Sequence, residues 1–270
     1  MPEDRKLLKI CENVRKEILL MSYRAKSAHV GGSLSSVEIL VSLYFKILNI
    51  FPNDPNNVNR DRLILSKAHD VKALYAVLAE RGFFNKEILK SYEKDGGKLP
   101  GHSTRNCVPG VEVSAGSLGH GLSMAAGMAY VGKLDKKKHK VFVLLSDGEC
   151  DEGSVWEAIL FSGHHKLDNL IAIIDYNGFQ GFGATNEVLN LEPFAKKWEC
   201  FGWATKEANG HNIEEIISSL ENLPFEKDKP SVLIAHTIKG KGGVIENEAT
   251  VESHYKSITE DNLRKLKIIE

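Results

Sequence analysis

The segment Val141–Gln180 constrains the fold of this chain most strongly. It holds two short apolar runs, Val141-Phe-Val-Leu-Leu and Leu170-Ile-Ala-Ile-Ile, with a helical pattern between them. Apolar runs of this length are typical of buried strands, so the segment predicts two parallel strands joined by a helix. Strands and helices alternate along the rest of the chain as well. We therefore expect one doubly wound α/β domain over residues 1–270, with a mostly parallel sheet and helices on both faces.

The composition excludes several classes of protein. With 270 residues and 42% hydrophobic residues, the chain can bury a substantial core. Its formal net charge of −1 gives no electrostatic case for binding nucleic acid or an acidic membrane. No apolar run reaches the length of a membrane span, and the charged start does not resemble a signal peptide. The four cysteines lack zinc spacing and disulfide density, so we expect a cytoplasmic protein.

Apolar periodicity predicts the remaining elements. Strands are expected at residues 62–66 and 231–236, and helices at 4–26, 37–48, 71–80, 122–134, 191–201, 213–220 and from 259 onward. The helical pattern breaks at Ala28–Gly32, and Ser33 or Ser35 is expected to cap the next helix. Residues 95–119 form a long loop without periodicity, and long loops in compact domains tend to be functional.

Polar residues follow both strands of the central unit. Asp147 stands at the end of the first strand, and Asn177 stands just past the second. The carboxyl ends of parallel strands meet at one edge of the sheet, where ligands bind. A carboxylate and an amide oxygen brought together there suit a hard cation such as Mg²⁺.

Gly148 lets the backbone approach a ligand closely, and the helix that follows directs free N–H groups at an anion. A cation and an anion at one place suggest a diphosphate bound through magnesium. Taken singly, each residue is more simply a helix cap or a turn residue. Taken together in a strand–helix–strand unit, they favour the cofactor interpretation.

Three histidines lie in loops or at a strand end: His29, His69 and His102. Imidazole titrates near neutral pH, so such residues can transfer protons, although a solvated loop histidine is the commoner case. Cys150 lies close to Asp147, but no basic partner is adjacent in sequence. A small buried turn residue is therefore favoured over a nucleophile.

These motifs together resemble a known family. The segments Ser146-Asp147-Gly148-Glu149, Glu152-Gly153-Ser154 and Asp175-Tyr176-Asn177 resemble the thiamine diphosphate motif of transketolases. Further matches occur in the family's order: Lys26–His29, Leu65–His69, Pro100–His102, Gly116–Gly121 and His236–Gly240. The short chain is similar to the N-terminal subunit of a split transketolase, which transfers a two-carbon ketol unit from a ketose phosphate to an aldose.

The resemblance implies roles for individual residues. Asp147 and Asn177 would bind Mg²⁺, or Ca²⁺ or Mn²⁺, through their side chains, and Phe179 would do so through its carbonyl. Glu152 would lie at the subunit interface, facing the partner's catalytic glutamate. Gly148 would contact the diphosphate through its backbone, with His69 nearby. Gly116 and Leu118 would contact the ring region of the cofactor. The reacting centre would be lined by His29, His102 and His254.

The resemblance also implies a partner. A C-terminal, pyrimidine-binding transketolase subunit would complete the site, in an expected heterotetramer, and this chain alone is expected to be inactive. Val30 follows His29 where the family usually has Pro, and Ser103-Thr104 follow His102 where many members have Pro-Glu. Both departures are expected on the substrate side, so the ordinary pentose phosphate substrates are left open. Tyr255 follows His254 where Gly is usual, so a different backbone is expected there.

Three alternatives remain at this point. The first is a transketolase-like carboligase with another donor or acceptor, such as pyruvate or a modified sugar. The second is the α subunit of a 2-oxo acid dehydrogenase, which is not expected to show this histidine set. The third is a non-catalytic scaffold subunit that has kept the fold.

Overall fold

A five-stranded parallel sheet forms the centre of the molecule. The computed structural model describes residues 3–243 and 248–270. The strand order is β1-β2-β3-β5-β4, and every neighbouring pair is parallel, which confirms the predicted fold class. The strands are β1 (Arg62–Leu65), β2 (Val141–Ser146), β3 (Leu170–Tyr176), β4 (Ala204–Asn209) and β5 (Ser231–His236).

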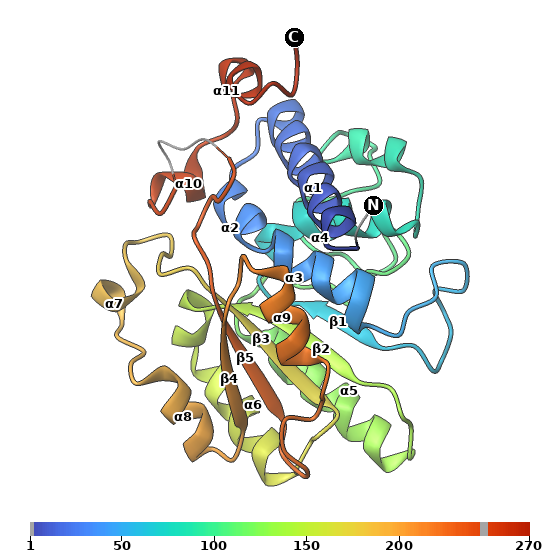
Figure 1. Cartoon of the computed structure of the whole chain (residues 1–270), viewed down its shortest axis with the longest axis vertical. Coiled ribbons are helices and arrows are strands. Elements are labelled where there is room, and N and C mark those ends of the chain that lie inside the picture. Colours follow the sequence, from blue (N-terminus) through green and yellow to red (C-terminus); the bar gives the residue numbers. More distant parts are fainter. Residues whose placement is uncertain (1–2, 244–247) are drawn as a thin grey trace.

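Helices cover both faces of this sheet (Figure 1). Helices α3 and α9 lie in front of the sheet in Figure 1, whereas α5 and α6 lie behind it. In the part of the chain that the structure describes, four short 3-10 or π segments connect these elements: η1 (Leu43–Ile47), η2 (Ala68–Asp70), η3 (Lys86–Ser91) and η4 (Gly148–Asp151). The helices are α1 (Glu3–Ala25), α2 (Val30–Ser35), α3 (Val37–Ser42), α4 (Val71–Arg81), α5 (His120–Leu134), α6 (Gly153–His164), α7 (Thr185–Val188), α8 (Phe194–Cys200), α9 (Ile213–Leu220), α10 (Glu252–Tyr255) and α11 (Glu260–Lys265).

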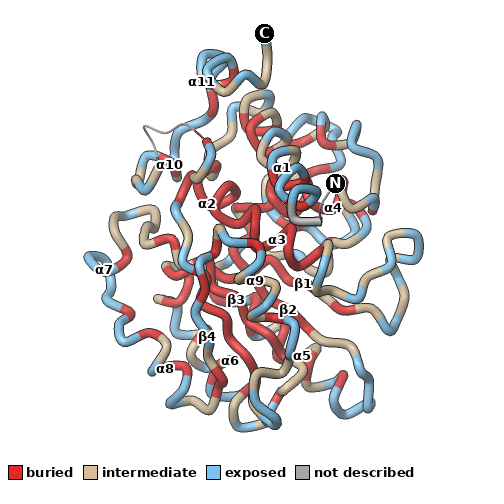
Figure 2. The backbone as a smooth tube through the Cα atoms, in the orientation of Figure 1, coloured by how far each residue is buried: buried red, intermediate tan, exposed pale blue. Residues whose placement is uncertain are grey.

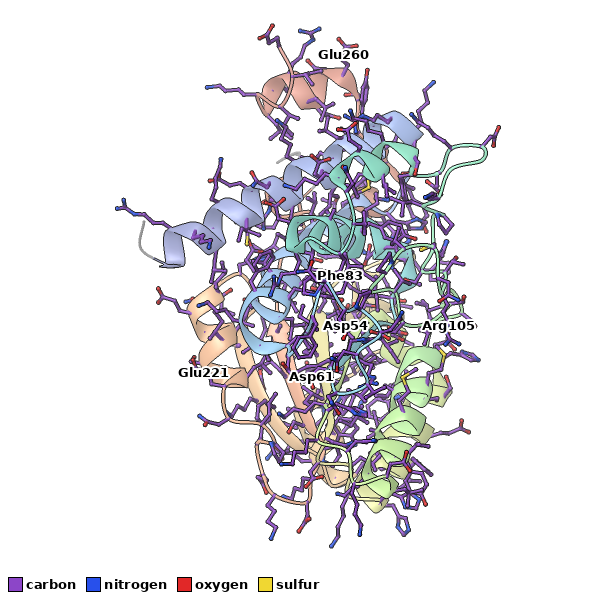
Figure 3. The ribbon with its side chains drawn as sticks, turned by 90° about the vertical axis from the view of Figure 1, so that its right-hand side faces the viewer. Asp54, Asp61, Phe83, Arg105, Glu221 and Glu260 are labelled. Carbon is purple, nitrogen blue, oxygen red and sulfur yellow. The ribbon has the colours of Figure 1, made fainter. Side chains whose placement is uncertain are left out.

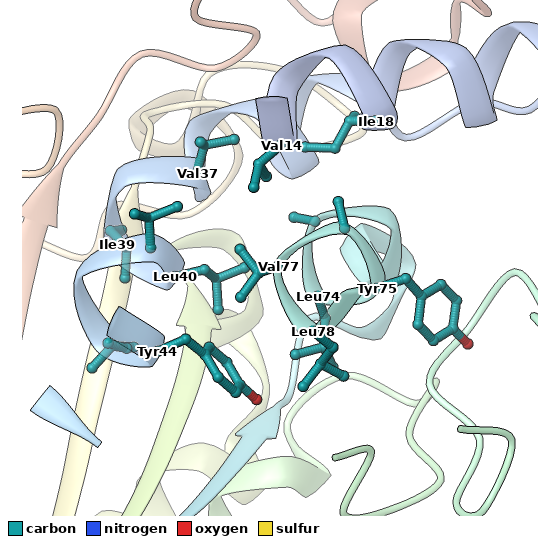
Figure 4. Close-up of a cluster of buried hydrophobic side chains, with 14 of the residues drawn as sticks. Val14, Ile18, Val37, Ile39, Leu40, Tyr44, Leu74, Tyr75, Val77 and Leu78 are labelled. Atoms are coloured by element: carbon teal, nitrogen blue, oxygen red, sulfur yellow. The ribbon is translucent and has the colours of Figure 1, made fainter. Parts of the chain in front are cut away.

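Alternation along the strands divides the core into two layers. Phe142 and Leu144 pack with α1 to α4 and α9, whereas Val143 and Leu145 pack with α5, α6 and α8. The strands are buried along most of their length (Figure 2). Figure 4 shows a part of the first of these two layers, where side chains of α1, α3 and α4 pack against one another. A parallel sheet covered on both faces leaves its strand ends as the place for a site.

The amino edge of the sheet is closed by Asp61, which is buried. Its carboxylate accepts hydrogen bonds from the Lys140 N–H at 2.7 Å and the Asn49 N–H at 2.9 Å. Figure 3 labels Asp61 among the side chains of this part of the molecule. These bonds join the segments that precede β1 and β2, and thereby fix where the two strands begin relative to each other.

Two sequence predictions near residue 30 are wrong. Helix α2 begins at Val30, inside the expected break, and Ser36 rather than Ser33 or Ser35 is the N-cap of α3. The Ser33 hydroxyl donates to the His29 carbonyl at 3.0 Å, and the Ser35 hydroxyl donates to Asp175 at 2.6 Å. The Ser33 hydroxyl is therefore bound to the preceding turn, and the Ser35 hydroxyl is bound to a buried acid, so neither caps α3.

The expected helix over residues 37–48 divides into α3 and the π segment η1. Strand β4 is absent from the sequence predictions, because only Ala204 and Ala208 are buried in it and it lies at the sheet edge. Within the described ranges, no helix has the length and apolar character needed to cross a bilayer.

Candidate functional site

A cavity of about 290 Å³ opens at the carboxyl edge of the sheet. It brings together residues from the ends of β2 and β3, the long loop before α5, and the segments around α2 and α10. Nine of the eleven site residues predicted from the sequence line it: His29, His69, His102, Gly116, Leu118, Gly148, Asn177, Phe179 and His254.

Asp147 lies next to this lining and is fully buried. Its Oδ2 accepts hydrogen bonds from the Gly178 N–H at 2.8 Å and from the Thr185 hydroxyl at 2.9 Å. Its Oδ1 is also buried and has no hydrogen-bond partner among the described residues. Burial raises the pKa of Asp147 to about 6. A divalent cation would bind this unpartnered oxygen and would stabilise the buried negative charge of the carboxylate.

Asn177 and Phe179 supply the other two oxygens. The side-chain N–H of Asn177 donates to Asp175 Oδ2 at 3.3 Å. This bond identifies the amide nitrogen, so the other atom, Asn177 Oδ1, is the acceptor oxygen. The Phe179 carbonyl accepts from the Lys239 ammonium at 2.8 Å, and no second donor to this oxygen is found among the described residues. One carboxylate, one amide and one carbonyl oxygen therefore fit the mixed set that Mg²⁺ takes beside phosphate oxygens.

Two glycines allow the tight backbone around this oxygen set. A Cβ atom at Gly148 would lie 2.8 Å from the Cβ of Gln180, so a side chain there would displace the loop. Gly178 has φ +77°, a conformation that L side chains rarely adopt, and its N–H is the one bound to Asp147.

Besides Asp70, the cavity wall contains the acid Glu149. It is buried, and its Oε1 accepts from the Gly119 N–H at 2.9 Å and from the Ser66 hydroxyl. Glu149 thereby connects the start of α5 to the ends of β1 and β2. Glu152 is exposed just before α6 and does not line the cavity, so its expected position facing a partner chain stays a prediction.

A buried ion network supports the floor of the site. The fully buried Lys67 pairs with Asp175 and, at 3.1 Å, with Asp70. These charges hold the pKa of Asp70 below its usual range and that of Lys67 above its own. Asp175 also accepts from the Thr237 hydroxyl. The network therefore joins β1, β3 and the segment after β5 below the cofactor-binding residues.

Replacing Lys67 by methionine is expected to destabilise the fold by about 3–5 kcal/mol, because two buried carboxylates lose their cation. Urea unfolding measures this loss. The matched control is Lys133→Met, which removes the half-exposed partner of Asp168 and should cost at most about 1 kcal/mol. Equal losses in the two variants would show that the buried network stabilises the fold no more than an exposed ion pair does.

Four histidines form one cluster in the cavity. The ring centroid of His29 lies 5.3 Å from that of His69, 4.8 Å from that of His254 and 6.4 Å from that of His102. Burial lowers the pKa of His69 and of His254 to about 4 and also lowers the pKa of His29. These three imidazoles are therefore neutral at pH 7, and each offers one donor and one acceptor nitrogen. Within the described residues, no group of acid, histidine or cysteine side chains has the arrangement of a metal site by itself.

The lowered pKa of His69 has a consequence for stability. Between pH 6.5 and 4, His69 is protonated in the unfolded chain but stays neutral in the folded chain. The free energy of unfolding therefore falls as the pH falls through this window. By pH 5 the loss from His69 should reach about 2 kcal/mol. Urea unfolding at pH 6.5 and 5 should therefore give a flatter dependence for His69→Gln than for the wild type. The exposed control, His164→Gln, should follow the wild type, and a parallel profile for His69→Gln would contradict the assignment.

Sequence reasoning missed several residues of this site. Lys239, which is buried beside Phe179, and Asp70, which pairs with Lys67, both line the cavity. The matched segment His236–Gly240 contains Lys239 but assigns it no role, and no sequence pattern marks Asp70. Cys150 is fully buried, and burial raises its pKa well above the usual value, which confirms the structural interpretation over the nucleophile.

Comparison with known protein families gives one result for almost the whole chain. Residues 10–269 match the family described as "Transketolase, thiamine diphosphate binding domain".

Two similar relatives are parts of enzymes rather than whole enzymes. The chain is 45% identical, over 231 residues, to one of the subunits of the apulose-4-phosphate transketolase of Phocaeicola vulgatus, covering 86% of this chain and 82% of that protein. It is 43% identical, over 233 residues, to a 6-deoxy-6-sulfo-D-fructose transketolase subunit of a Clostridium species, covering 86% and 84%.

Solved structures with the same fold are longer. Transketolase from Leishmania mexicana superimposes with a TM-score of 0.90 and 27% identity, over 97% of this chain and 40% of that one. Transketolase from Campylobacter jejuni gives a TM-score of 0.86 and 32% identity, over 96% and 42%. The chain thus spans about two fifths of the length of these structures.

Proposed function

This chain belongs to the transketolase family, of which it carries the thiamine diphosphate binding domain, and on that premise we propose that it is the cofactor-binding subunit of a two-chain transketolase. One observation carries the proposal. The oxygen set of Asp147, Asn177 and Phe179 and the cluster of neutral histidines meet at a single cavity. A site that only stored a cofactor would have no use for the histidines, whereas ketol transfer needs both parts.

The charged end of the site has a binding role. Asp147, Asn177 and the Phe179 carbonyl would hold Mg²⁺, with Ca²⁺ or Mn²⁺ as alternatives, and the ion would bridge to the diphosphate. Lys239 adds a buried positive charge beside Phe179. Gly148 offers close backbone approach, and His69, which lines the same cavity, would lie near the diphosphate. When bound there, thiamine diphosphate supplies the carbanion chemistry that breaks and forms a carbon–carbon bond.

The histidine end of the site has a proton-transfer role. His29, His102 and His254 would bind the hydroxyl and carbonyl oxygens of the sugars and exchange protons with them. The neutral form of His29 and His254 supports this role, since a neutral imidazole can accept a proton at one nitrogen while donating from the other. Gly116 and Leu118, which also line the cavity, would contact the ring region of the cofactor.

A partner chain is part of the proposal. The relatives named above are called subunits, and the chain is short against the solved transketolases. We propose a C-terminal, pyrimidine-binding subunit that supplies the catalytic glutamate facing Glu152, in a heterotetramer of two pairs. The cysteines are free, which supports the reducing cytoplasm as the location.

The relatives' names also narrow the substrate. One acts on apulose 4-phosphate and the other on 6-deoxy-6-sulfo-D-fructose, neither of which is an ordinary pentose phosphate. The unusual neighbours of the histidines, Val30, Ser103 and Tyr255, agree with a changed sugar end. We therefore propose a phosphorylated or otherwise anionic ketose, including modified sugars, as the donor.

Calorimetric titration of thiamine diphosphate into the full chain, alone and mixed with its C-terminal partner, tests the proposal. Saturable binding is expected with Mg²⁺, and it should disappear when a chelator removes the ion. Absence of binding with every divalent ion, in the chain and in the mixture, would favour the scaffold alternative.

A further inference from the structure

Lys72 is a buried lysine that the cofactor site does not use. It lies on α4, its side chain is fully buried, and it does not line the cavity. Among the described residues, no carboxylate lies within ion-pair distance of its ammonium. The ammonium lies 5.4 Å from the ring centroid of Tyr92. A buried charge without an acid is costly, so a specific contact is expected to retain it.

That contact is with the backbone just before His29. The Lys72 ammonium donates to the Ala28 carbonyl at 2.6 Å, across 44 residues of sequence. His29 itself has φ 60° and ψ 39°, a left-handed conformation that is uncommon for a residue with a side chain. Such a conformation persists only where the surroundings determine it, and the Ala28–His29 peptide is the unit that must be held.

Two further hydrogen bonds fix the other side of this residue. The His29 N–H donates to the His254 carbonyl at 2.8 Å, and the His29 carbonyl accepts from the Ser33 hydroxyl at 3.0 Å. Lys72 therefore completes a set of three contacts around one backbone position. With all three in place, the imidazole of His29 lies beside those of His69 and His254 in the cavity.

We propose that Lys72 is a positioning residue, which holds the Ala28 carbonyl and thereby directs the His29 imidazole at the sugar substrate. The substrate part of this statement rests on the proposed transketolase function, whereas the orientation of His29 does not. Lys72 does not line the cavity, and its hydrogen bond reaches the site through the Ala28–His29 backbone.

The charge of Lys72 also acts on His29. The titratable and charged groups that face His29 are Asp70, Lys72, His102 and Glu93, together with His69 and His254 by ring contact. Burial is the main cause that lowers the pKa of His29, and Lys72 adds to the lowering. Removing this cation should therefore raise the pKa of His29, since its protonated form is repelled less.

Three variants of the full chain separate the hydrogen bond from the charge. Lys72→Met removes both, Lys72→Gln keeps a donor without the charge, and Lys6→Met is the exposed control. Circular dichroism first establishes that each variant is folded. NMR titration of histidine side chains labelled with ¹³C, with the His29 resonance assigned through His29→Asn, then gives the pKa of His29 in each. We expect it to rise in both Lys72 variants and to stay unchanged in the control.

Activity of the reconstituted pair gives the second readout. Lys72→Met should lower kcat/KM for the ketose donor about tenfold to a hundredfold, since a misplacement of about 1 Å costs this much. Thiamine diphosphate affinity should stay within about twofold of the wild type, and Lys72→Gln should recover most of the loss.

An unchanged pKa of His29 in a folded Lys72 variant overturns the proposal, as does a loss of cofactor affinity equal to the loss of kcat/KM. If Lys72→Met does not fold, the pKa of His29 in Lys72→Gln decides in the same way. Absence of ketol transfer in the wild-type pair would refute the proposed function, while the NMR titration would still decide the role of Lys72.

Discussion

Asp147→Ala is expected to weaken thiamine diphosphate binding by about a hundredfold or more. Residues that merely support a metal ligand typically cost about 10- to 100-fold in affinity when they are changed, and Asp147 is proposed to be a ligand itself. Its Oδ1 is buried without a hydrogen-bond partner among the described residues, so this oxygen is free to bind the ion. Because the ion joins protein and diphosphate, losing the ion should also remove the cofactor.

Calorimetry with saturating Mg²⁺ measures this effect. The matched control is Asp168→Ala, which removes a carboxylate at the opposite, amino end of β3, where it pairs with Lys133. The control should bind like the wild type. Wild-type affinity in Asp147→Ala would show that the metal assignment is wrong.

His29→Asn should lower kcat/KM for ketol transfer by about 10²- to 10⁴-fold in the reconstituted pair, which is the usual range for losing a general acid–base residue. Asparagine tolerates the left-handed conformation of this position better than most residues. The backbone contact with His254 should therefore survive, and the loss would report the imidazole rather than the fold.

Cofactor affinity of the same variant provides the internal control. It should equal that of the wild type, because His29 belongs to the histidine end of the cavity and Asp147 to the other. His164→Asn, on the exposed side of α6, should leave both quantities unchanged. A His29→Asn variant with normal turnover would exclude His29 from the chemistry.

The central unit of the fold was predictable because its strands are buried on both faces. Val141–Leu145 and Leu170–Ile174 pack helices on either side, so every residue of each run is apolar and the strand is easy to recognise. The same argument placed Asp147 and Asn177 at one edge. The structure agrees, since the Asp147 N–H donates to the Asp175 carbonyl at 3.4 Å.

Elements with weaker burial were not predictable in this way. Strand β4 has a mixed polar sequence, Ala-Thr-Lys-Glu-Ala-Asn, and is a strand because β5 offers it a partner. Helix α2 follows His29 in spite of two glycines. Ser35 and Ser36 both donate to Asp175, 140 and 139 residues away, a contact that no local pattern reveals.

The binding site shows the same division. His29, His69 and His102 could be selected as loop histidines, but their convergence depends on α2, η2 and the long loop meeting in space. Lys72 could not be selected, and Lys239 had no assigned role within its matched segment, because a buried lysine cannot be told from a surface lysine in a sequence. Motif resemblance supplied what spacing alone could not for Gly116 and Leu118.

The most direct measurement is a ketol-transfer assay with three samples: this chain, its C-terminal partner, and the two together, each with thiamine diphosphate and Mg²⁺. A ketose phosphate donor, modified ketoses and pyruvate should be screened against aldose acceptors. We expect turnover in the mixture with a ketose donor and none in either chain alone. Turnover by this chain alone, or none in a mixture that binds the cofactor, would contradict the account.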